Sequence, residues 1–256
     1  MDIMNKKTDG KVSIIIPARY GSTRFPGKPL AKINGKPMIY YVYKQAEKSK
    51  LATSVIIATD EERIFKAVVE FGGNVIYTSK NHESGTDRIA EIAESLPDNC
   101  EIIVNIQCDE PQINPLAIDQ MIEPLLKDHT LVMSTLITRI QHETELYDSN
   151  VVKVVKNRSN FALYFSRSLI PYQRGDGVVM YYKHLGAYAY RRNFLIKYSN
   201  LKPTPLEISE KLEQLRVLEN GYNIKLVETD YNSISVDTPE DLEKVQLIME
   251  NECKIL

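Results

Sequence analysis

The chain has 256 residues, 43% of them hydrophobic and 26% charged, which is an ordinary globular composition. Its length lies between the usual sizes for one and two domains, and we expect one large α/β unit with a smaller elaboration. The formal net charge of −2 argues against nucleic acid or an anionic membrane surface as a partner. No apolar run approaches membrane-spanning length and no signal-peptide pattern is present, so we expect a cytoplasmic protein. The cysteines Cys100, Cys108 and Cys253 are widely spaced, which argues against a disulfide framework or a cysteine-based zinc site.

Short apolar runs alternate with helical patterns in the first half of the chain. The runs are typical of strands buried on both faces, and they lie at residues 12–16, 55–58, 75–77 and 102–106. Apolar residues at helical spacing lie between them, at residues 39–46, 64–69 and 89–96. This alternation predicts βαβ units and a mostly parallel sheet.

The pattern changes after about residue 130. Strand-like segments follow with fewer helices between them, at residues 131–137, 151–155, 161–165 and 183–190. We therefore expect a mixed or antiparallel elaboration of the sheet. Two helices are predicted towards the end of the chain, one over residues 206–218 and one from Pro239 to about Glu250.

A long loop, residues 17–29, follows the first predicted strand and is called the first loop below. Ligands of open α/β sheets bind beyond the carboxyl ends of the strands, where this loop begins. Its glycines allow close backbone approach, and its cations Arg19, Arg24 and Lys28 would neutralise a triphosphate. The alternative is a solvated basic loop with no ligand.

Two other nucleotide motifs are disfavoured in this chain. A Walker A loop is excluded because Gly21 and Gly27 are one residue too far apart and Lys28 is followed by Pro29. The GxGxxG pattern of dinucleotide-binding oxidoreductases is absent from the sequence.

Two acidic residues stand out by their position. Asp109 follows the buried run at residues 102–106, at the sheet edge where the first loop should also open. Asp237 directly precedes a helix with Thr238 as its cap. Each also has an ordinary structural interpretation, because Asp favours both turns and helix starts.

The first loop reads PARYGSTRFPGKPL and is followed by INGKPMI, a combination that resembles the opening of the cytidylyltransferases specific for 3-deoxy-manno-octulosonate (Kdo). Further motifs of that family follow in the same order over nearly the whole chain. They are SGTDR at 84–88, DEP at 109–111, ALYFSR at 162–167, KHLG at 183–186, LEQLR at 212–216 and VDTPEDL at 236–242.

The resemblance implies a Rossmann-like α/β nucleotidyltransferase fold, with a mostly parallel central sheet and a smaller mixed α/β subregion. Residues 1–256 would form a single domain. About residues 11–130 would bind nucleotide, about 131–235 would bind sugar and form a dimer, and 236–256 would form a C-terminal helix that returns to the active site.

The family transfers the cytidylyl group of CTP to the anomeric hydroxyl of Kdo, giving CMP-Kdo and pyrophosphate for lipopolysaccharide biosynthesis. The resemblance implies the same magnesium-dependent reaction here, in a homodimer that binds neither nucleic acid nor membrane. Hard Mg²⁺ prefers carboxylate oxygens together with substrate phosphates. Asp109 and Asp237 would therefore be the metal ligands.

The resemblance also assigns the remaining site residues. The catalytic set is Arg19, Lys28, Asp109 and Asp237. The nucleotide would be bound by Arg19, Arg24, Lys28, Ser84, Gly85, Arg88 and Gln107. The sugar would be bound by Gln107, Arg167, His184, Glu213 and Gln214. Taken without the family, Ser84 or Thr86 would be a helix cap, His184 a structural histidine, and Glu213 and Gln214 the solvent face of the helix at 206–218, with Ile208 and Leu212 pointing inward.

Two departures from the family pattern are visible, of which the first bears on the metal geometry and the second on the sugar that is accepted. Cys108 replaces the glycine usual before DEP, and the segment between Arg174 and Lys183 is shorter than in many relatives. The rival functions are a cytidylyltransferase for 8-amino-Kdo or another acidic sugar, such as a sialic-acid-like nonulosonate, and a catalytically silent nucleotide-binding protein. The intact set of Lys28, Asp109 and Asp237 disfavours the last of these.

Overall fold

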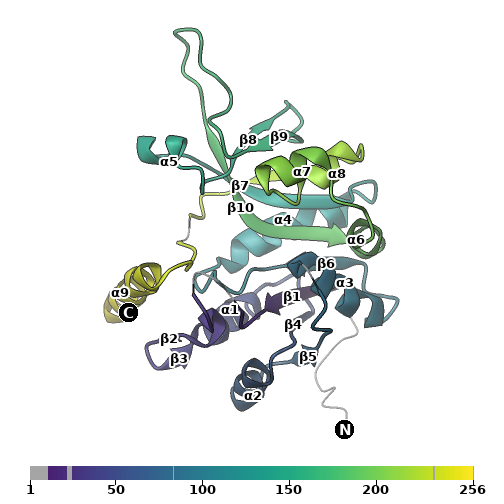
Figure 1. The fold of residues 1–256 in the computed structure, drawn as a ribbon, viewed down its shortest axis with the longest axis vertical. Coiled ribbons are helices and arrows are strands. Elements are labelled where there is room, and N and C mark those ends of the chain that lie inside the picture. The colour runs from purple at the N-terminus through teal and green to yellow at the C-terminus, as the bar shows by residue number, and fades with distance from the viewer. Residues whose placement is uncertain (1–10, 22–24, 83, 233, 256) are drawn as a thin grey trace. The chain divides into compact units, whose positions relative to one another are not determined.

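The computed structural model describes residues 11–21, 25–82, 84–232 and 234–255, with side chains described as far as Asn251. Two compact units are formed (Figure 1). The first unit is Met1–Asp119 with Ser233–Leu256, and the second is Gln120–Asn232. The single-domain organisation of residues 1–256 and its internal boundary near residue 130 stay predictions. Within the described residues, no helix has the length and apolar character that a membrane crossing requires.

The first unit contains four parallel strands, in the spatial order β6, β1, β4, β5. Successive strands of the chain are added first on one side of β1 and then, with β6, on its other side. The crevice between β1 and β6 at their carboxyl ends is therefore the topological switch point, where open α/β sheets bind ligands. The strands are β1 (Val12–Ala18), β4 (Ser54–Thr59), β5 (Val75–Tyr77) and β6 (Ile102–Asn105).

The predicted alternation of strands and helices is confirmed in this unit. Helices α1 (Met38–Ala46), α2 (Glu62–Glu70) and α3 (Gly85–Ser95) pack on the strands through their apolar faces (Figure 1). One expectation was wrong. Strand β5 is not buried on both faces, because it lies at the edge of these four strands, and its Tyr77 is half exposed.

The C-terminal helix α9 (Pro239–Ile255) belongs to the first unit although it is the last element of the chain. Its Val245 and the preceding Val236 pack with Ile33 and Met38 in a fully buried cluster. Ile33 belongs to the short strand β2 (Lys32–Ile33), which pairs antiparallel with β3 (Lys36–Pro37). Packing of apolar residues thus brings the segment before α9 next to the elements that follow the first loop.

The second unit has a mixed sheet, as expected. Strand β7 (Met133–Arg139) pairs antiparallel with β10 (Tyr182–Arg191) and parallel with β11 (Lys225–Glu228). Strands β8 (Lys153–Lys156) and β9 (Ala162–Ser166) continue it in antiparallel pairs. The helices are α5 (Glu143–Tyr147), α6 (Arg192–Ser199), α7 (Pro205–Glu210) and α8 (Leu215–Glu219), while α4 (Pro115–Lys127) crosses the division between the units.

The single helix predicted over residues 206–218 is wrong. The structure breaks it into α7 and α8 at Lys211, whose φ of 52° is left-handed and ends the first helix. Glu213 and Gln214 consequently lie in the break and not on the solvent face of a helix. Ile208, expected to point inward, is 64% exposed, whereas Leu212 is buried.

Candidate active site

Lys28 is the centre of a charged cluster at the switch point of the first unit. It begins the 3₁₀ helix η1 (Lys28–Leu30), directly after Gly27, whose φ of 72° is in the left-handed region. Its Nζ donates hydrogen bonds to Asp109 Oδ2 at 2.6 Å and to Asp237 Oδ1 at 3.2 Å. These three residues are far apart in sequence, and the fold brings them together as expected.

Two elements place the acids around Lys28. Asp109 follows β6 and so lies at the carboxyl end of a strand next to β1. Asp237 is held beside it because the neighbouring Val236 N–H donates to the Asp109 carbonyl oxygen at 2.9 Å. Thr238 caps α9, as expected, by accepting a hydrogen bond from the Asp241 N–H. Asp237 therefore points to Lys28 while other residues provide the cap.

Burial and charge act in opposite directions on Lys28. Burial alone would lower the pKa of this ammonium, but the Asp109 carboxylate and its hydrogen bond, with Asp237, raise the pKa above its usual value. Lys28 is thus a permanent cation held between two carboxylates. Burial, followed by the nearby Asp109 charge, raises the pKa of the Cys108 thiol to about 12, so this side chain is neutral beside the cluster.

The two carboxylates are a suitable donor set for a hard cation. They already share one cation, the Lys28 ammonium. Mg²⁺ commonly takes one or two protein carboxylates and completes its shell with water and phosphate oxygens. Among the residues that the structure describes, no three His, Cys, Asp or Glu side chains form a group that would hold a metal without such added ligands.

Arg19 connects the first loop to the segment before α3. Its guanidinium donates to the carbonyl oxygens of His82 at 2.8 Å and of Ser84 at 2.5 Å. Ser84 is the N-cap of α3 and forms a full capping box with Asp87, so its interpretation as a cap is confirmed. Gly85 lies close to Pro17 near the end of β1, since a Cβ on Gly85 would be 3.5 Å from the Pro17 side chain. The start of α3 therefore lies next to the first loop.

Arg88 is expected to contact the nucleotide, but its side chain is almost completely buried. It is 1% exposed, hydrogen-bonded to Thr78 Oγ1, and ion-paired with Asp60 at 3.2 Å. Its Nε has no hydrogen-bond partner among the described residues. It helps to line a pocket of about 190 Å³ together with Arg19, Tyr20, Gly21, Asp60, Glu61, Lys80 and His82.

Sequence reasoning missed the part that Asp60 plays in this pocket. Asp60 follows Thr59 directly but does not cap α2, because Glu61 is the N-cap of that helix and Asp60 pairs with Arg88. The rule that identified Asp109 would have found it, because Asp60 also follows the carboxyl end of a parallel strand, β4. Gln107 follows β6 and donates to Asn105 Oδ1, while Arg24 lies outside the described residues.

A second polar cluster lies in the second unit and is built around a bulge in β10. The register with β7 shifts between Leu185 and Tyr188. Thr135 of β7 donates to the Ala187 carbonyl in this irregular stretch and lies 2.9 Å from His184 Nε2. The His184 and Tyr188 rings are in contact, with centroids 5.2 Å apart. Burial lowers the pKa of His184 to about 3, so the imidazole is neutral at physiological pH.

Gln214 joins this cluster from the break between α7 and α8. Tyr188 donates to its Oε1 at 3.3 Å, and its Nε2 has no partner among the described residues although Gln214 is only 3% exposed. The backbone of Glu213 is fixed because its carbonyl accepts a hydrogen bond from Tyr198 at 2.7 Å. Tyr188 was not predicted as a site residue. Gly186 is the one feature of the sequence that indicates a bulge in this strand.

Arg167 is engaged by backbone carbonyls of the second unit. Its Nε donates to the backbone carbonyl oxygen of Glu210 at 2.7 Å, and its terminal nitrogens donate to the carbonyl oxygens of Ser149 and Lys211. The backbone N–H of Arg167 also donates to the Glu210 carboxylate. Arg167 therefore fixes the end of α7, next to Glu213 and Gln214, and its part in binding a sugar carboxylate stays a prediction.

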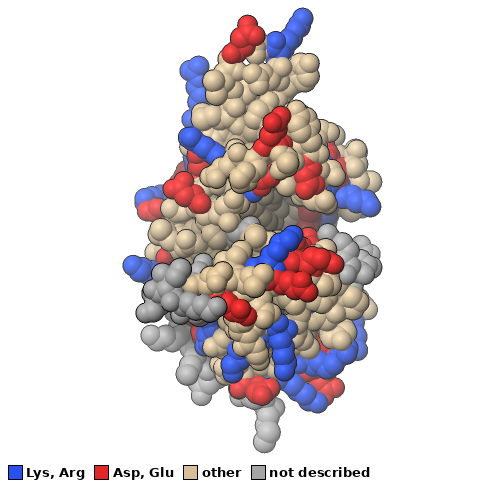
Figure 2. Space-filling model, turned by 90° about the vertical axis from the view of Figure 1, so that its left-hand side faces the viewer, with Lys and Arg blue, Asp and Glu red and all other residues tan. Residues whose placement is uncertain are grey.

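The charge of the site is local. Figure 2 shows acidic and basic side chains mixed over one face of the molecule, in keeping with the formal net charge of −2. The charged cluster at Lys28 is an arrangement of three particular side chains.

Comparison with known proteins adds an independent line of evidence. Residues 13–228 match the family model described as cytidylyltransferase. The chain is 53% identical over 246 residues to a protein of Geotalea uraniireducens (strain Rf4) named 3-deoxy-manno-octulosonate cytidylyltransferase, covering 92% of this chain and 97% of the relative. A protein of Fusobacterium nucleatum subsp. nucleatum with the same name is 52% identical over 242 residues, covering 94% and 98%.

The fold has a similar counterpart among solved structures. A CMP:2-keto-3-deoxy-manno-octonic acid synthetase complexed with CTP superimposes with a TM-score of 0.91 at 44% identity, over 95% of this chain and 100% of that one. The expected α/β fold with a mostly parallel central sheet and a small antiparallel sheet is confirmed by this match.

Proposed function

The chain belongs to the 3-deoxy-manno-octulosonate cytidylyltransferases, and we propose that it joins the cytidylyl group of CTP to Kdo, giving CMP-Kdo and pyrophosphate for lipopolysaccharide biosynthesis. The observation that carries this proposal is the convergence of Lys28, Asp109 and Asp237 at the switch point between β1 and β6. A triphosphate needs such fixed charges, and a parallel sheet binds its ligand at such a point.

In this reaction the anomeric hydroxyl of Kdo attacks the α-phosphorus of CTP. A new oxygen–phosphorus bond forms, the bond to the oxygen that bridges the α- and β-phosphorus atoms breaks, and one proton and pyrophosphate are released. Lys28 would stabilise the negative charge that develops on the phosphate oxygens, because its ammonium is already held in place by the fold. No side chain needs to form a covalent intermediate.

Asp109 and Asp237 would hold Mg²⁺, and the metal would supply neutralisation of the triphosphate charge. Arg19 would hold the first loop against the start of α3, since its guanidinium already joins these segments. Arg88 and Ser84 would contribute to the nucleotide site from this same region, with Gly85 allowing close approach. The unpartnered Nε of Arg88 in the pocket wall supports this assignment.

The second unit would select the sugar partly through neutral hydrogen-bonding groups. Gln214 has a buried donor with no partner among the described residues, and leaving such a donor unpaired costs about 1–3 kcal/mol. A sugar hydroxyl would satisfy it. We assign Arg167, His184 and Glu213 to the same sugar site and Gln107 of the first unit to either substrate.

A panel of pyrophosphate-release assays tests the proposed function. It crosses CTP, UTP and ATP with Kdo, 8-amino-Kdo and sialic acid. We expect CTP with Kdo to give the fastest release. Faster release with 8-amino-Kdo would move the substrate to that analogue, faster release with sialic acid would contradict the Kdo-type assignment, and no release with any pair would identify a nucleotide-binding protein without activity.

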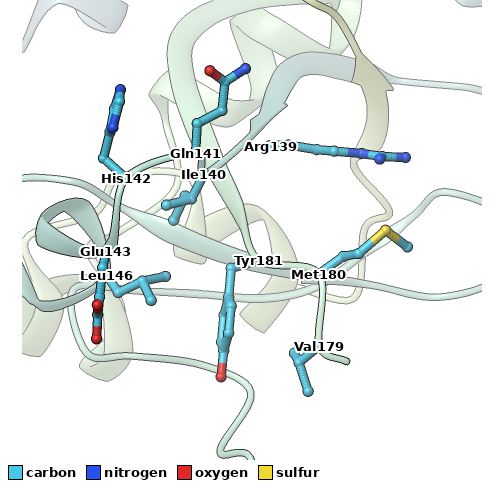
Figure 3. Close-up of a pocket in the computed structure, with 9 residues that line it drawn as sticks. All are labelled: Arg139, Ile140, Gln141, His142, Glu143, Leu146, Val179, Met180 and Tyr181. Atoms are coloured by element: carbon cyan, nitrogen blue, oxygen red, sulfur yellow. The ribbon is translucent and has the colours of Figure 1, made fainter. Parts of the chain in front are cut away.

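We also propose that the enzyme is a cytoplasmic homodimer that uses the second unit as its interface. A pocket of about 300 Å³ is formed by residues 139–143, Leu146 and residues 179–181 (Figure 3). Beside it the loop between β9 and β10 exposes large apolar side chains, including Tyr172 at 84% and Val178 at 97%. The exposed apolar loop and the pocket lie in the same unit. In a two-fold dimer the loop of each copy would cover the pocket of the other, and both surfaces would be buried.

Sedimentation velocity tests this interface. Val178→Asp is expected to shift the sedimentation coefficient from dimer to monomer. Leu247→Asp is the matched control, because Leu247 is also a large exposed apolar residue, at 60%, but lies on α9 of the first unit. A monomeric parent protein, or a dimer that Val178→Asp leaves intact, would contradict the proposed interface.

A further inference from the structure

Arg63 has no place in the motifs described above, yet its side chain contacts the first loop. It lies in the first turn of α2, and its guanidinium carbon is 3.5 Å from the centroid of the Tyr20 ring. Its Nε is 2.7 Å from Glu61 Oε1. Glu61 is itself fixed as the N-cap of α2, because it accepts the Arg63 N–H. The start of α2 therefore holds the guanidinium against Tyr20.

Tyr20 also touches the far end of the first loop. The Gly27 N–H donates to the Tyr20 carbonyl oxygen at 2.8 Å, so these two residues lie next to each other. A Cβ on Gly27 would lie 3.0 Å from two Tyr20 ring atoms, a separation tighter than side chains normally allow. The positive φ of Gly27 disfavours other residues there as well. The Tyr20 ring thus packs on the backbone at Gly27.

Lys28 is the next residue after Gly27, and its Nζ must lie within hydrogen-bond distance of Asp109 and Asp237. Resting on the function proposed above, we propose that Arg63 is a positioning residue for CTP binding. Its guanidinium holds Tyr20, Tyr20 holds Gly27, and the backbone at Gly27 sets where the Lys28 ammonium lies. Arg63 acts through the ring and does not contact the nucleotide.

The expected effect is modest and specific. A cation over an aromatic ring at an exposed site supports about a two- to five-fold change in an equilibrium constant. Arg63 is more than half exposed, so this range applies. Loss of the contact should weaken CTP binding by that factor, with little change in kcat at saturating CTP.

A double-mutant cycle on CTP binding tests the proposal. Calorimetric titration of CTP without sugar is applied to Arg63→Ala, Tyr20→Leu and the double variant. Tyr20→Phe keeps the ring, so Arg63→Ala should weaken CTP binding by a similar factor in the Tyr20→Phe background and in the parent protein. Lys66→Ala is the matched control, because Lys66 is an exposed cation of the same helix that pairs with Glu62. The titration measures CTP binding in the absence of sugar. A protein that makes no CMP-Kdo would therefore still show whether Arg63 affects CTP binding, so the positioning role and the proposed function are tested separately.

We expect Arg63→Ala and Tyr20→Leu each to raise the dissociation constant of CTP about two- to five-fold. The double variant should be no worse than Tyr20→Leu, since Arg63 has no ring to hold in that background. Parent-like kcat at saturating CTP would separate this role from general damage to the fold. The proposal is overturned if Arg63→Ala weakens CTP binding by the same factor with and without the Tyr20 ring, or weakens it no more than Lys66→Ala.

Discussion

The two units of the molecule handle polar groups in different ways. In the first unit the cluster at Lys28 consists of full charges, one ammonium between two carboxylates, that remain partly open to solvent. In the second unit the cluster around His184, Tyr188 and Gln214 is neutral, mostly buried and hydrogen-bonded. Fixed charges suit a triphosphate with a metal, whereas neutral donors and acceptors suit sugar hydroxyls. The contrast suggests that the first unit handles the charge of the triphosphate and that the neutral cluster of the second unit handles the hydroxyls of the sugar.

The largest effect is expected from removal of the central cation. Lys28→Ala should lower the rate of CMP-Kdo formation by about 10²–10³-fold, as is typical when one fixed group that stabilises developing charge is lost. The fold should be retained, because Lys28 lies in the three-residue helix η1 and its ammonium pairs with Asp109 and Asp237, away from the apolar core. Lys32→Ala, at an exposed lysine of β2, is the control. An unchanged rate at both limiting and saturating CTP would remove Lys28 from the mechanism.

The next effect concerns the paired acids. Asp109→Asn and Asp237→Asn should each raise the magnesium requirement and lower turnover by about tenfold or more, and the double variant should be little worse than the worse single one. Magnesium titrations of steady-state rates measure this.

Asp241→Asn is the control for the paired acids, because Asp241 accepts hydrogen bonds at the same helix start without contacting Lys28. It should show normal magnesium dependence and a small loss of stability. If Asp237→Asn behaves like Asp241→Asn, Asp237 is only a helix-start residue.

Arg167→Lys should affect the sugar and spare the nucleotide. Lysine keeps the charge but loses the planar fork that reaches the carbonyls of Glu210, Lys211 and Ser149. The end of α7 should loosen, lowering the unfolding free energy by about 1–3 kcal/mol and raising KM for Kdo several-fold. Kinetics with Kdo and calorimetry with CTP separate the substrates. Equal losses for both would show a general structural role.

The smallest effect is a pH dependence of stability. The pKa of His184 is about 3 in the folded protein, below its value of 6.5 when unperturbed, so the unfolded chain binds the extra proton between these values. The stabilising contribution is present above pH 6.5 and is lost as the pH falls towards 3. Between pH 7 and pH 5 it should amount to about 1–2 kcal/mol.

Urea unfolding at pH 7 and pH 5 measures this contribution. His184→Asn should be less sensitive to the change of pH than the parent protein, because the titrating group is gone. Equal sensitivity in both proteins would show that His184 is protonated as easily in the folded state as in the unfolded chain.

The sequence predicted the first unit better than the second. Continuous apolar runs identified β1, β4 and β6, and the rule that ligands bind at strand ends placed the first loop and Asp109 together. These features follow from patterns within single segments. The break at Lys211 left no such pattern, because Leu212 and Leu215 continue helical spacing across a left-handed residue that is not glycine.

Side-chain contacts between distant segments were also beyond the sequence. The stack of Arg63 on Tyr20 depends on how α2 packs beside β4, which neither segment reveals alone. The engagement of Arg167 by three carbonyls is similar, since the ALYFSR motif indicates a cation but not its acceptors.

The division between a nucleotide-binding first unit and a sugar-binding second unit is tested most directly with Gln214→Leu. This change removes the buried amide donor at similar side-chain size and leaves the first unit untouched. Calorimetric titration should give the parent dissociation constant for CTP in this variant, while its KM for Kdo rises at least several-fold. Weakening of CTP binding by as much as the use of Kdo would contradict the division.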